Sequence, residues 1–362
     1  MIFKRKHDSF PPKLPLKNLN WDRFVHLIGP ANAGIGKFDG ILSNIPNPAI
    51  LLTPLRHEEA LLSSRIEGTQ ASLREVLQFE VRGRETDKKA ELEEVVNYAV
   101  ALEQAARDLE NQSLTNKLIK EAHRNLMSGV RGENKNPGEY RNTQVYIGNP
   151  GMGIRNAVYV PPPHTKVKTL MSNLEKYIDM DDRDQLVQLA IIHGQFEIIH
   201  PFTDGNGRVG RMLLPLYLYL KKSITFPSFY LSGYLEANRS AYYEALSNIS
   251  RHRDWEGWIV FFLHAVIKQA EDSISRAQGI MNLYERTKVQ FVEFLNSRYS
   301  IVILDILFNR PVFSSRDFVT AGIPQASAYR ALRTLVKNNV VTSTPDSRYK
   351  LYFFDRLLEI VE

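Results

Sequence analysis

The chain has 362 residues, 43% of them hydrophobic and 24% charged, with a formal net charge of +6 and no cysteine. The length allows two or three domains with a sizeable core, and the missing cysteines exclude disulfides and thiolate metal sites. No segment approaches the length of a membrane span, and the basic N-terminus lacks the apolar run of a signal peptide. We therefore expect a globular cytoplasmic protein without membrane contact, whose mild positive charge permits but does not establish binding to nucleic acid.

The first third of the chain is predicted to be an extended arm followed by helices. Residues 1–45 mix Pro, Asn, Lys and Gly, a composition typical of an arm. Apolar periodicity then predicts helices, the first of which stops at Gly68. The predicted helices of this part cover residues 49–69, 69–79, 91–110 and 116–127.

The middle of the chain changes from helical to β-type patterning and back. Two short β-prone runs, Val145-Tyr146-Ile147-Gly148 and residues 157–160, flank a segment rich in Gly, Asn and Pro, which predicts a β-hairpin over residues 145–160. The helical periodicity then resumes at residues 167–179, 185–199, 208–221, 239–250 and 255–284.

Residues 200–211, His-Pro-Phe-Thr-Asp-Gly-Asn-Gly-Arg-Val-Gly-Arg, connect two of these predicted helices. Gly205 and Gly207 can take positive φ without steric cost, so the backbone N–H groups around Asn206 can turn inward and form an anion nest. The helix that follows adds the partial positive charge and unpaired N–H groups of its N-terminus, which suit a phosphate. The pattern therefore predicts a cradle for a polyphosphate.

Four charged or titratable side chains complete this segment. Arg208 and Arg211 lie three apart on one helix face, and arginine forks match pairs of phosphate oxygens. Asp204 is the kind of carboxylate that anchors Mg²⁺ beside phosphates, and His200 has the ordinary pKa of a general base at neutral pH. A lone Gly-Asn-Gly is usually a plain turn and a lone histidine is usually structural, but the whole set in fixed order favours a functional site.

The segment from about residue 287 onward has a different pattern. Residues 301–308, 314–319 and 325–338 are helical, with a turn at 321–324. Two β-prone runs, 340–344 and 349–353, follow on either side of a Pro-Asp-Ser-Arg turn. The order of these elements predicts a small winged helix-turn-helix domain.

Residues 200–211 resemble the signature of the Fic family, His-x-Phe-x-(Asp/Glu)-Gly-Asn-Gly-Arg-x-x-Arg, at every specified position. The resemblance covers about residues 45 to 270 and implies a mainly α fold, with a Fic-type helical core and one β-hairpin flap. It also implies an activity: the transfer of AMP from ATP to a Tyr, Ser or Thr hydroxyl of a target protein and of the enzyme itself. With the tail, the expected division is residues 1–110, a catalytic core at 111–285, and a winged-helix domain at 287–362.

The resemblance assigns a role to each residue of the motif. His200 deprotonates the target hydroxyl, and Asp204 holds Mg²⁺ on the α- and β-phosphates. Residues 205–208, that is Gly205, Asn206, Gly207 and Arg208, seat the phosphates, and Arg211 grips the γ-phosphate. The hydroxyl then attacks the α-phosphorus in line and pyrophosphate leaves.

Three further segments resemble parts of the family. The hairpin of residues 145–160 resembles the flap that clamps the nucleotide and pairs with the extended backbone of the target; an ordinary surface hairpin is the alternative. Tyr242 and Tyr243 resemble the adenine-pocket tyrosines, although core packing explains either one nearly as well. Residues 63–68 resemble the inhibitory helix (Ser/Thr)-x-x-x-Glu-(Gly/Asn), in which Ser63, Glu67 and Gly68 match and Glu67 would occupy Arg211 in place of the γ-phosphate.

Several alternatives stay open at this point. The same site could remove AMP from proteins, with Glu67 orienting a water, or move a phosphoryl or phosphocholine group, because a fold does not fix the group transferred. The chain could also be a DNA-binding regulator. Its tail carries Arg330, Arg333 and Lys337 on the second helix and Arg348 and Lys350 in the wing, together with several acidic residues. A winged helix can equally dock a protein or form a homodimer.

Overall fold

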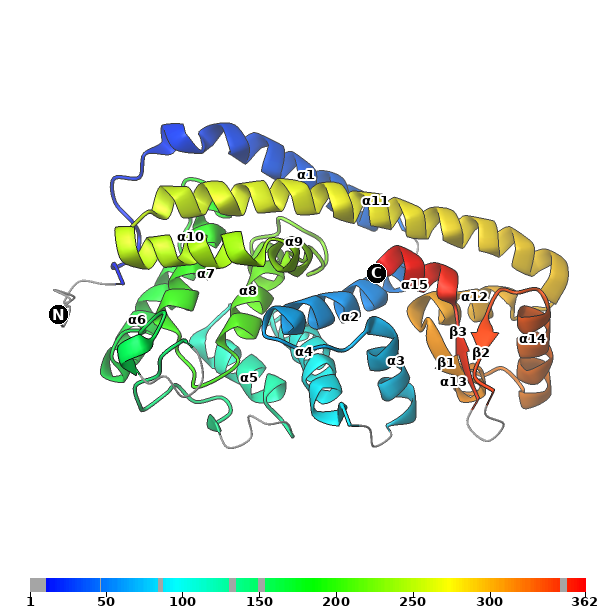
Figure 1. Cartoon of the computed structure of the whole chain (residues 1–362). Coiled ribbons are helices and arrows are strands. Elements are labelled where there is room, and N and C mark those ends of the chain that lie inside the picture. The colour runs from blue at the N-terminus through cyan, green and yellow to red at the C-terminus, as the bar shows by residue number, and fades with distance from the viewer. Residues whose placement is uncertain (1–10, 46, 84–86, 130–134, 149–153, 346–349) are drawn as a thin grey trace. The chain divides into compact units, whose positions relative to one another are not determined.

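The computed structural model describes residues 11–362 apart from 46, 84–86, 130–134, 149–153 and 346–349, and the described chain is mainly helical (Figure 1). It divides into two compact units, each discontinuous in sequence. Unit 1 comprises residues 1–36 and 100–270, and unit 2 comprises residues 37–99 and 271–362. The division into three consecutive domains stays a prediction.

Unit 1 is built around α7 (Gln185–Ile199), which is buried along almost its whole length. A helix that is hydrophobic on all sides belongs in a core, and α7 packs against α6 (His164–Asp179), α8 (Asn206–Leu220) and α10 (Arg239–His252). Asp184 caps its N-terminus by accepting two backbone N–H groups. The other elements of this unit are η1 (Trp21–Arg23), the start of α1 (Val25–Ser43), the end of α4 (Lys89–Asp108), α5 (Asn116–Leu126), η3 (Ile154–Asn156), α9 (Ser232–Ala237) and the start of α11 (Trp255–Leu295).

The extended arm expected over residues 1–45 is wrong for residues 25–43, which form α1. Leu27, Ala31 and Ile35 recur on one face of this helix and are buried. Gly34 allows a close approach to α11, because a Cβ built on it would lie 2.7 Å from the Cβ of Ala270. Burial of one face therefore outweighs the poor helix propensity of the glycines and the proline in this stretch.

Unit 2 joins α2 (Ala49–Ile66) and α3 (Leu73–Arg82) to the C-terminal segment. α2 packs against α12 (Ser300–Asn309) and α15 (Asp355–Val361), whereas α3 packs against β1 (Val312–Ser314). The unit also contains most of α4, the end of α11, α13 (Ser315–Thr320), α14 (Gln325–Lys337), β2 (Thr342–Ser343) and β3 (Leu351–Phe353).

The C-terminal strands form an antiparallel sheet in the order β1-β3-β2, with Val312 and Thr342 both opposite Phe353. α13, α14, β2 and β3 occupy the predicted positions, whereas β1 and α15 were not expected. The helix expected to end at residue 284 continues to Leu295, so the predicted start of the tail at residue 287 falls inside α11. Residue 348, at the tip of the expected wing, lies outside the described residues, and the winged-helix assignment stays a prediction. None of the helices in the described ranges is both long and apolar enough to cross a lipid bilayer.

Candidate active site

The connection between α7 and α8 carries the histidine predicted to be catalytic. His200 is the C-cap of α7, with φ 50° and ψ 63°, and its N–H donates to the carbonyl of Phe196. This left-handed conformation ends the helix and turns the chain. Arg141 donates from Nε to the His200 carbonyl at 2.8 Å and from its backbone N–H to the Pro201 carbonyl at 2.9 Å. Because Arg141 is only 3% exposed, a buried cation fixes the start of the loop.

Asn206 fixes the other end of the loop. Its Oδ1 accepts the N–H of Phe202 at 2.8 Å, and its Nδ2 donates to the Phe202 carbonyl at 2.9 Å. Gly205 is the N-cap of α8 with φ 74°, a value that favours glycine. Gly207 lies in the first helical turn and does not have positive φ, so only one of the two glycines acts as the nest pattern requires. The Asn206 side chain shapes the loop, and its part in seating phosphates stays a prediction.

His123 of α5 supports the same loop, and the sequence analysis did not single it out. Its Nδ1 accepts the N–H of Gly138 at 2.8 Å, so its Nε2 carries the proton and donates to the Asp204 carbonyl at 3.0 Å. Its ring stacks on Phe202 with centroids 3.8 Å apart and an angle of 4° between planes. Burial lowers the pKa of His123 to about 4, which keeps the ring neutral. The sequence feature that could have pointed to His123 is its place on the apolar face of an amphipathic helix.

Two buried arginines bring positive charge to the start of α8. Arg208 is 5% exposed and Arg211 is 1% exposed. The Asp204 side chain is about half exposed; its Oδ1 accepts the Gly205 N–H at 2.6 Å and lies 3.8 Å from Nη2 of Arg208. Guanidinium forks beside the N–H groups of a helix N-terminus form an environment suited to a phosphate.

Asp204 fits a cation that is shared with a ligand. Its Oδ1 takes the contacts with Gly205 and Arg208, which leaves Oδ2 as a donor atom. In the part of the chain that the structure describes, no three His, Asp or Glu side chains lie close enough to hold a metal ion by themselves. Mg²⁺ commonly takes one or two carboxylates and completes its shell with water and substrate phosphates. One carboxylate beside a helix end suited to a phosphate fits that requirement.

The two candidate adenine-pocket tyrosines have different environments. Tyr242 is 1% exposed, and its hydroxyl lies 3.0 Å from Nε2 of His193, whose Nδ1 lies 3.1 Å from the carbonyl of Gly210. Because that carbonyl can only accept, Nδ1 carries the proton and the Tyr242 hydroxyl donates to Nε2. Tyr243 is 43% exposed, with the guanidinium of Arg239 5.8 Å from its ring. Tyr243 is the more accessible of the two, and contact of either one with adenine stays a prediction.

In the described part of the predicted flap, a β-bridge joins Ile147 and Tyr159. The Ile147 N–H donates to the Tyr159 carbonyl at 2.8 Å, and the Ile147 carbonyl accepts the N–H of Val158 at 2.8 Å. Tyr146, Ile147 and Val158 are exposed, at 39%, 41% and 62%. Val145 and Gly148 flank the bridge residue, whereas residues 149–153 lie outside the described part. Exposed apolar side chains beside a β-bridge are compatible with a flap that contacts an extended peptide.

The predicted inhibitory motif belongs to unit 2. Ser63 is fully buried in α2, the helix ends at Ile66, and Glu67 is its C-cap. Gly68 follows with φ 110°, which confirms the predicted helix stop. The pairing of Glu67 with Arg211 stays a prediction.

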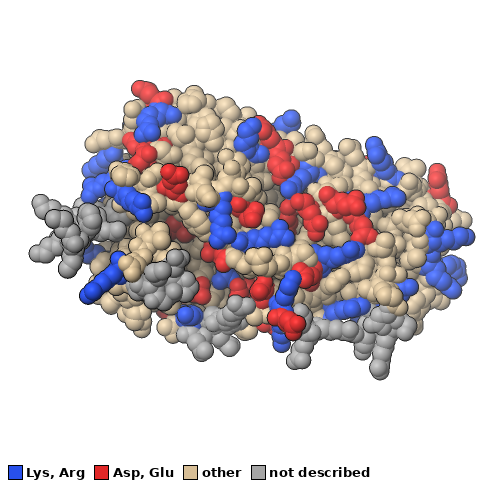
Figure 2. Space-filling view, in the orientation of Figure 1, with Lys and Arg blue, Asp and Glu red and all other residues tan. Residues whose placement is uncertain are grey.

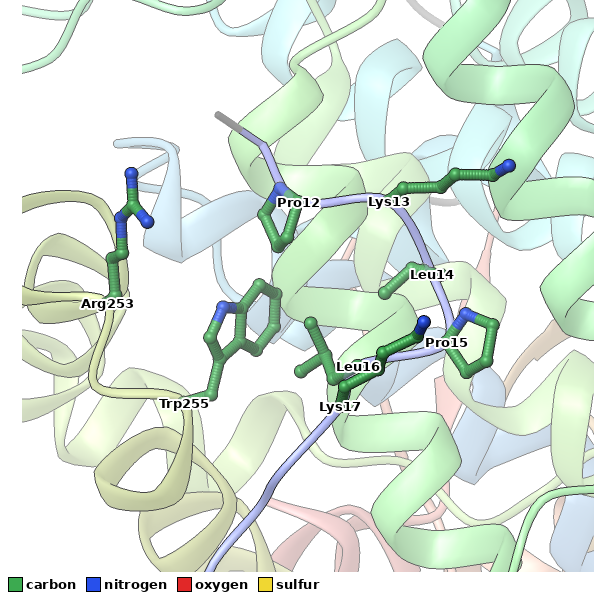
Figure 3. A pocket seen from close by; sticks show the side chains of 8 residues that line it. All are labelled: Pro12, Lys13, Leu14, Pro15, Leu16, Lys17, Arg253 and Trp255. Carbon is green, nitrogen blue, oxygen red and sulfur yellow. The ribbon is translucent and has the colours of Figure 1, made fainter. Parts of the chain in front are cut away.

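A cavity of about 560 Å³ lies elsewhere in unit 1 (Figure 3). Residues 12–17 line one side of it, and Arg253 and Trp255 line the other. No residue of the 200–211 segment lines this cavity, so the candidate active site is a separate feature.

Two family models match the chain. The Fic/DOC family N-terminal model matches residues 25–107, and the Fic/DOC family model matches residues 113–218, which include the whole 200–211 segment. Together they cover just over half of the sequence, and the chain belongs to the Fic/DOC family.

Curated relatives match part of the chain. A probable protein adenylyltransferase, aq_aa38 of Aquifex aeolicus (strain VF5), is 31% identical over 166 residues, which cover 44% of this chain and 47% of that protein. The protein adenylyltransferase Fic of Drosophila grimshawi is 32% identical over 158 residues, 41% of this chain and 30% of that protein. The matches thus span less than half the length of these relatives.

Solved structures show the same fold over a longer stretch. A Fic family protein from Desulfovibrio desulfuricans G20 covers 94% of this chain and 97% of its own, with a TM-score of 0.61 at 22% identity. A Fic domain containing signaling protein from Bacteroides thetaiotaomicron covers 69% of this chain and 97% of its own, with a TM-score of 0.55 at 17% identity. These similarities confirm the predicted Fic-type helical fold.

Proposed function

We propose that this chain is a protein adenylyltransferase that moves AMP from ATP to a hydroxyl of a target protein and of itself. One observation carries the proposal. A single short loop, shaped by Arg141, Asn206 and His123, joins His200 to the N-terminus of α8, where Arg208 is buried. A base and a helix end suited to phosphate on one hydrogen-bonded connection are the parts that this transfer needs. The names of the curated relatives support the same activity.

In the proposed reaction, His200 takes the proton of the target hydroxyl. The hydroxyl oxygen forms a bond to the α-phosphorus of ATP, and the bond from that phosphorus to the bridging oxygen breaks, so that pyrophosphate leaves. Arg208 and Arg211 balance the charge of the phosphates, and Asp204 would hold the shared Mg²⁺. The metal, when bound, would neutralise charge on the α- and β-phosphates.

Two further segments would control this reaction. The residues next to Ile147, whose own N–H and carbonyl are bonded within the hairpin, would pair with an extended segment of the target and present its hydroxyl. Glu67 would limit the reaction by occupying Arg211 in place of the γ-phosphate. Its removal should therefore raise activity, whereas most substitutions lower it.

Intact mass spectrometry after incubation with ATP and Mg²⁺ tests the proposed activity. The purified chain should gain the mass of one or more AMP groups, and Glu67→Gly should gain more than the parent. His200→Ala, carried alongside as a folded control, should gain none. A gain of phosphate mass would instead identify phosphoryl transfer, and loss of AMP from a modified protein would identify AMP removal.

A second proposal concerns the C-terminal segment, which we propose to be a winged helix that contacts DNA through α14. The support is that Arg330, Arg333 and Lys337 are exposed on this helix, although charges of both signs are interspersed over the face shown in Figure 2. A gel shift of the full chain on duplex DNA should weaken with salt and disappear when these three residues are changed to Gln. The absence of a shift would favour a protein-docking or homodimer role, and an unchanged shift in the triple variant would mean that the DNA contact does not involve these three residues of α14.

A further inference from the structure

One arginine joins three helices of unit 2, among them the helix of the inhibitory motif. Arg276, on α11, forms an ion pair with Glu58 of α2 and another with Asp272 of its own helix, the latter at 2.8 Å. The same guanidinium donates to the backbone carbonyl of Val361 in the last turn of α15. A single side chain therefore ties α2 to the C-terminal helix.

The C-terminal helix is held from its other end as well. Arg74, on α3, pairs with Asp355 at the start of α15, and its guanidinium lies 4.2 Å from the ring centroid of Phe353 on β3. Ile360 packs at Gly279 of α11, where an added Cβ would lie 3.3 Å from its Cγ2. α15 is thus held by contacts with α3 and α11. A shift of α15 would disturb the contacts of Arg276 with Glu58 and with the Val361 carbonyl.

The ion pair between Glu58 and Arg276 affects the stability of α2. It is only 8% exposed, and burial raises its pKa to about 7, while the nearby charge of Arg276 opposes that rise. Without Arg276 the pKa of Glu58 would rise further, and its carboxyl group would be buried either as an unpaired charge or protonated without its present partner, so α2 should open more easily. Glu58 and Glu67 belong to one helix and its cap, with Ser63 fully buried between them, so a displacement at Glu58 carries along the inhibitory residue.

We infer that Arg276 is a positioning residue for the inhibitory helix, and that the C-terminal segment sets the strength of inhibition through the Glu58–Arg276–Val361 contacts. The inference rests on the proposed adenylyltransferase activity and on the inhibitory role of Glu67. Its consequence is that an event that loosens α15 from α11, such as binding of a ligand to the C-terminal segment, would relieve inhibition.

The test uses the full chain and two readouts, one of which does not need catalysis. Hydrogen exchange of the α2 amides, followed by mass spectrometry, should speed up about tenfold or more in Arg276→Gln, because local opening of α2 becomes easier. Arg310→Gln is the matched control: it removes an ion pair of the same unit, with Asp317 at 2.8 Å, that does not involve α2. Arg276→Lys, which keeps the charge, should lie between the parent and Arg276→Gln.

Self-modification with ATP is the second readout. Arg276→Gln should raise it several-fold, and the Arg276→Gln/Glu67→Gly double variant should not exceed Glu67→Gly alone. Unchanged exchange in folded Arg276→Gln, or faster exchange without higher transfer while Glu67→Gly is active, overturns the inference. If hydrogen exchange of α2 speeds up in Arg276→Gln but no variant gains AMP, the proposed activity is wrong, although Arg276 still stabilises α2. Arg74→Gln, which removes the partly exposed ion pair with Asp355, is the second variant if Arg276→Gln does not fold. It should show the same increases in α2 exchange and self-modification, but smaller ones.

Discussion

Replacing His123 with phenylalanine tests the hydrogen bonds that hold the loop of the candidate active site. Phenylalanine keeps an aromatic ring to stack on Phe202, but it removes the bond from the Gly138 N–H and the bond to the Asp204 carbonyl. Each bond contributes about 1 kcal/mol, and a buried group left without a partner costs about 1–3 kcal/mol. His123→Phe should therefore lower the free energy of unfolding by about 2–4 kcal/mol, and AMP transfer should fall with it.

Urea denaturation at pH 7.5 measures the loss for His123→Phe, with His252→Phe as the control because His252 is exposed. His123→Gln should recover part of the stability, since an amide can replace one of the two bonds. A loss below about 0.5 kcal/mol for His123→Phe, the range of ordinary surface changes, would refute the reasoning that these bonds fix the loop.

Three further predictions follow from other parts of unit 1. Gly34→Ala should destabilise the protein by about 1–3 kcal/mol in the same assay, because its Cβ would overlap that of Ala270; a neutral effect would mean that the helices separate without cost. Burial and the charge of Arg211 lower the pKa of His193 from 6.5 to about 3, so the unfolded chain binds more protons in that window and stability falls as the pH drops below 6.5. His193→Gln should reduce the loss between pH 6.5 and 5 by about 2 kcal/mol, and an unchanged pH profile would contradict this account. Ile147→Pro removes the N–H that donates to the Tyr159 carbonyl, so it should break the bridge of the hairpin and reduce AMP transfer to protein while ATP binding by calorimetry stays near the parental value; equal loss of both would contradict a role of the hairpin in aligning the target.

Local signals predicted the elements that lie closest to the candidate site. Most residues of α7 are apolar and the Gly-rich loop follows the helix directly, so periodicity and turn chemistry located both. Gly68 likewise marks the end of α2 with its positive φ. These features depend on residues that are neighbours in sequence, which is why they could be predicted.

The features that could not be predicted depend on contacts between distant residues. α1 contains several glycines, and only its packing against α11 makes Gly34 favourable there. His123 and Arg141 lie far from the loop in sequence, yet they bind the carbonyls of Asp204 and His200. A backbone carbonyl leaves no trace in the amino-acid sequence, so neither side chain could be assigned to the loop beforehand.

The most direct test of the central claim compares ATP labelled with ³²P at the α position with ATP labelled at the γ position. The Glu67→Gly variant, incubated with Mg²⁺, should incorporate the α label into protein and none of the γ label. The double variant Glu67→Gly/His200→Ala should lose that incorporation by about 10²-fold or more, as removal of a general base predicts. Incorporation of the γ label, or α labelling that survives the loss of His200, would contradict adenylyl transfer by this loop.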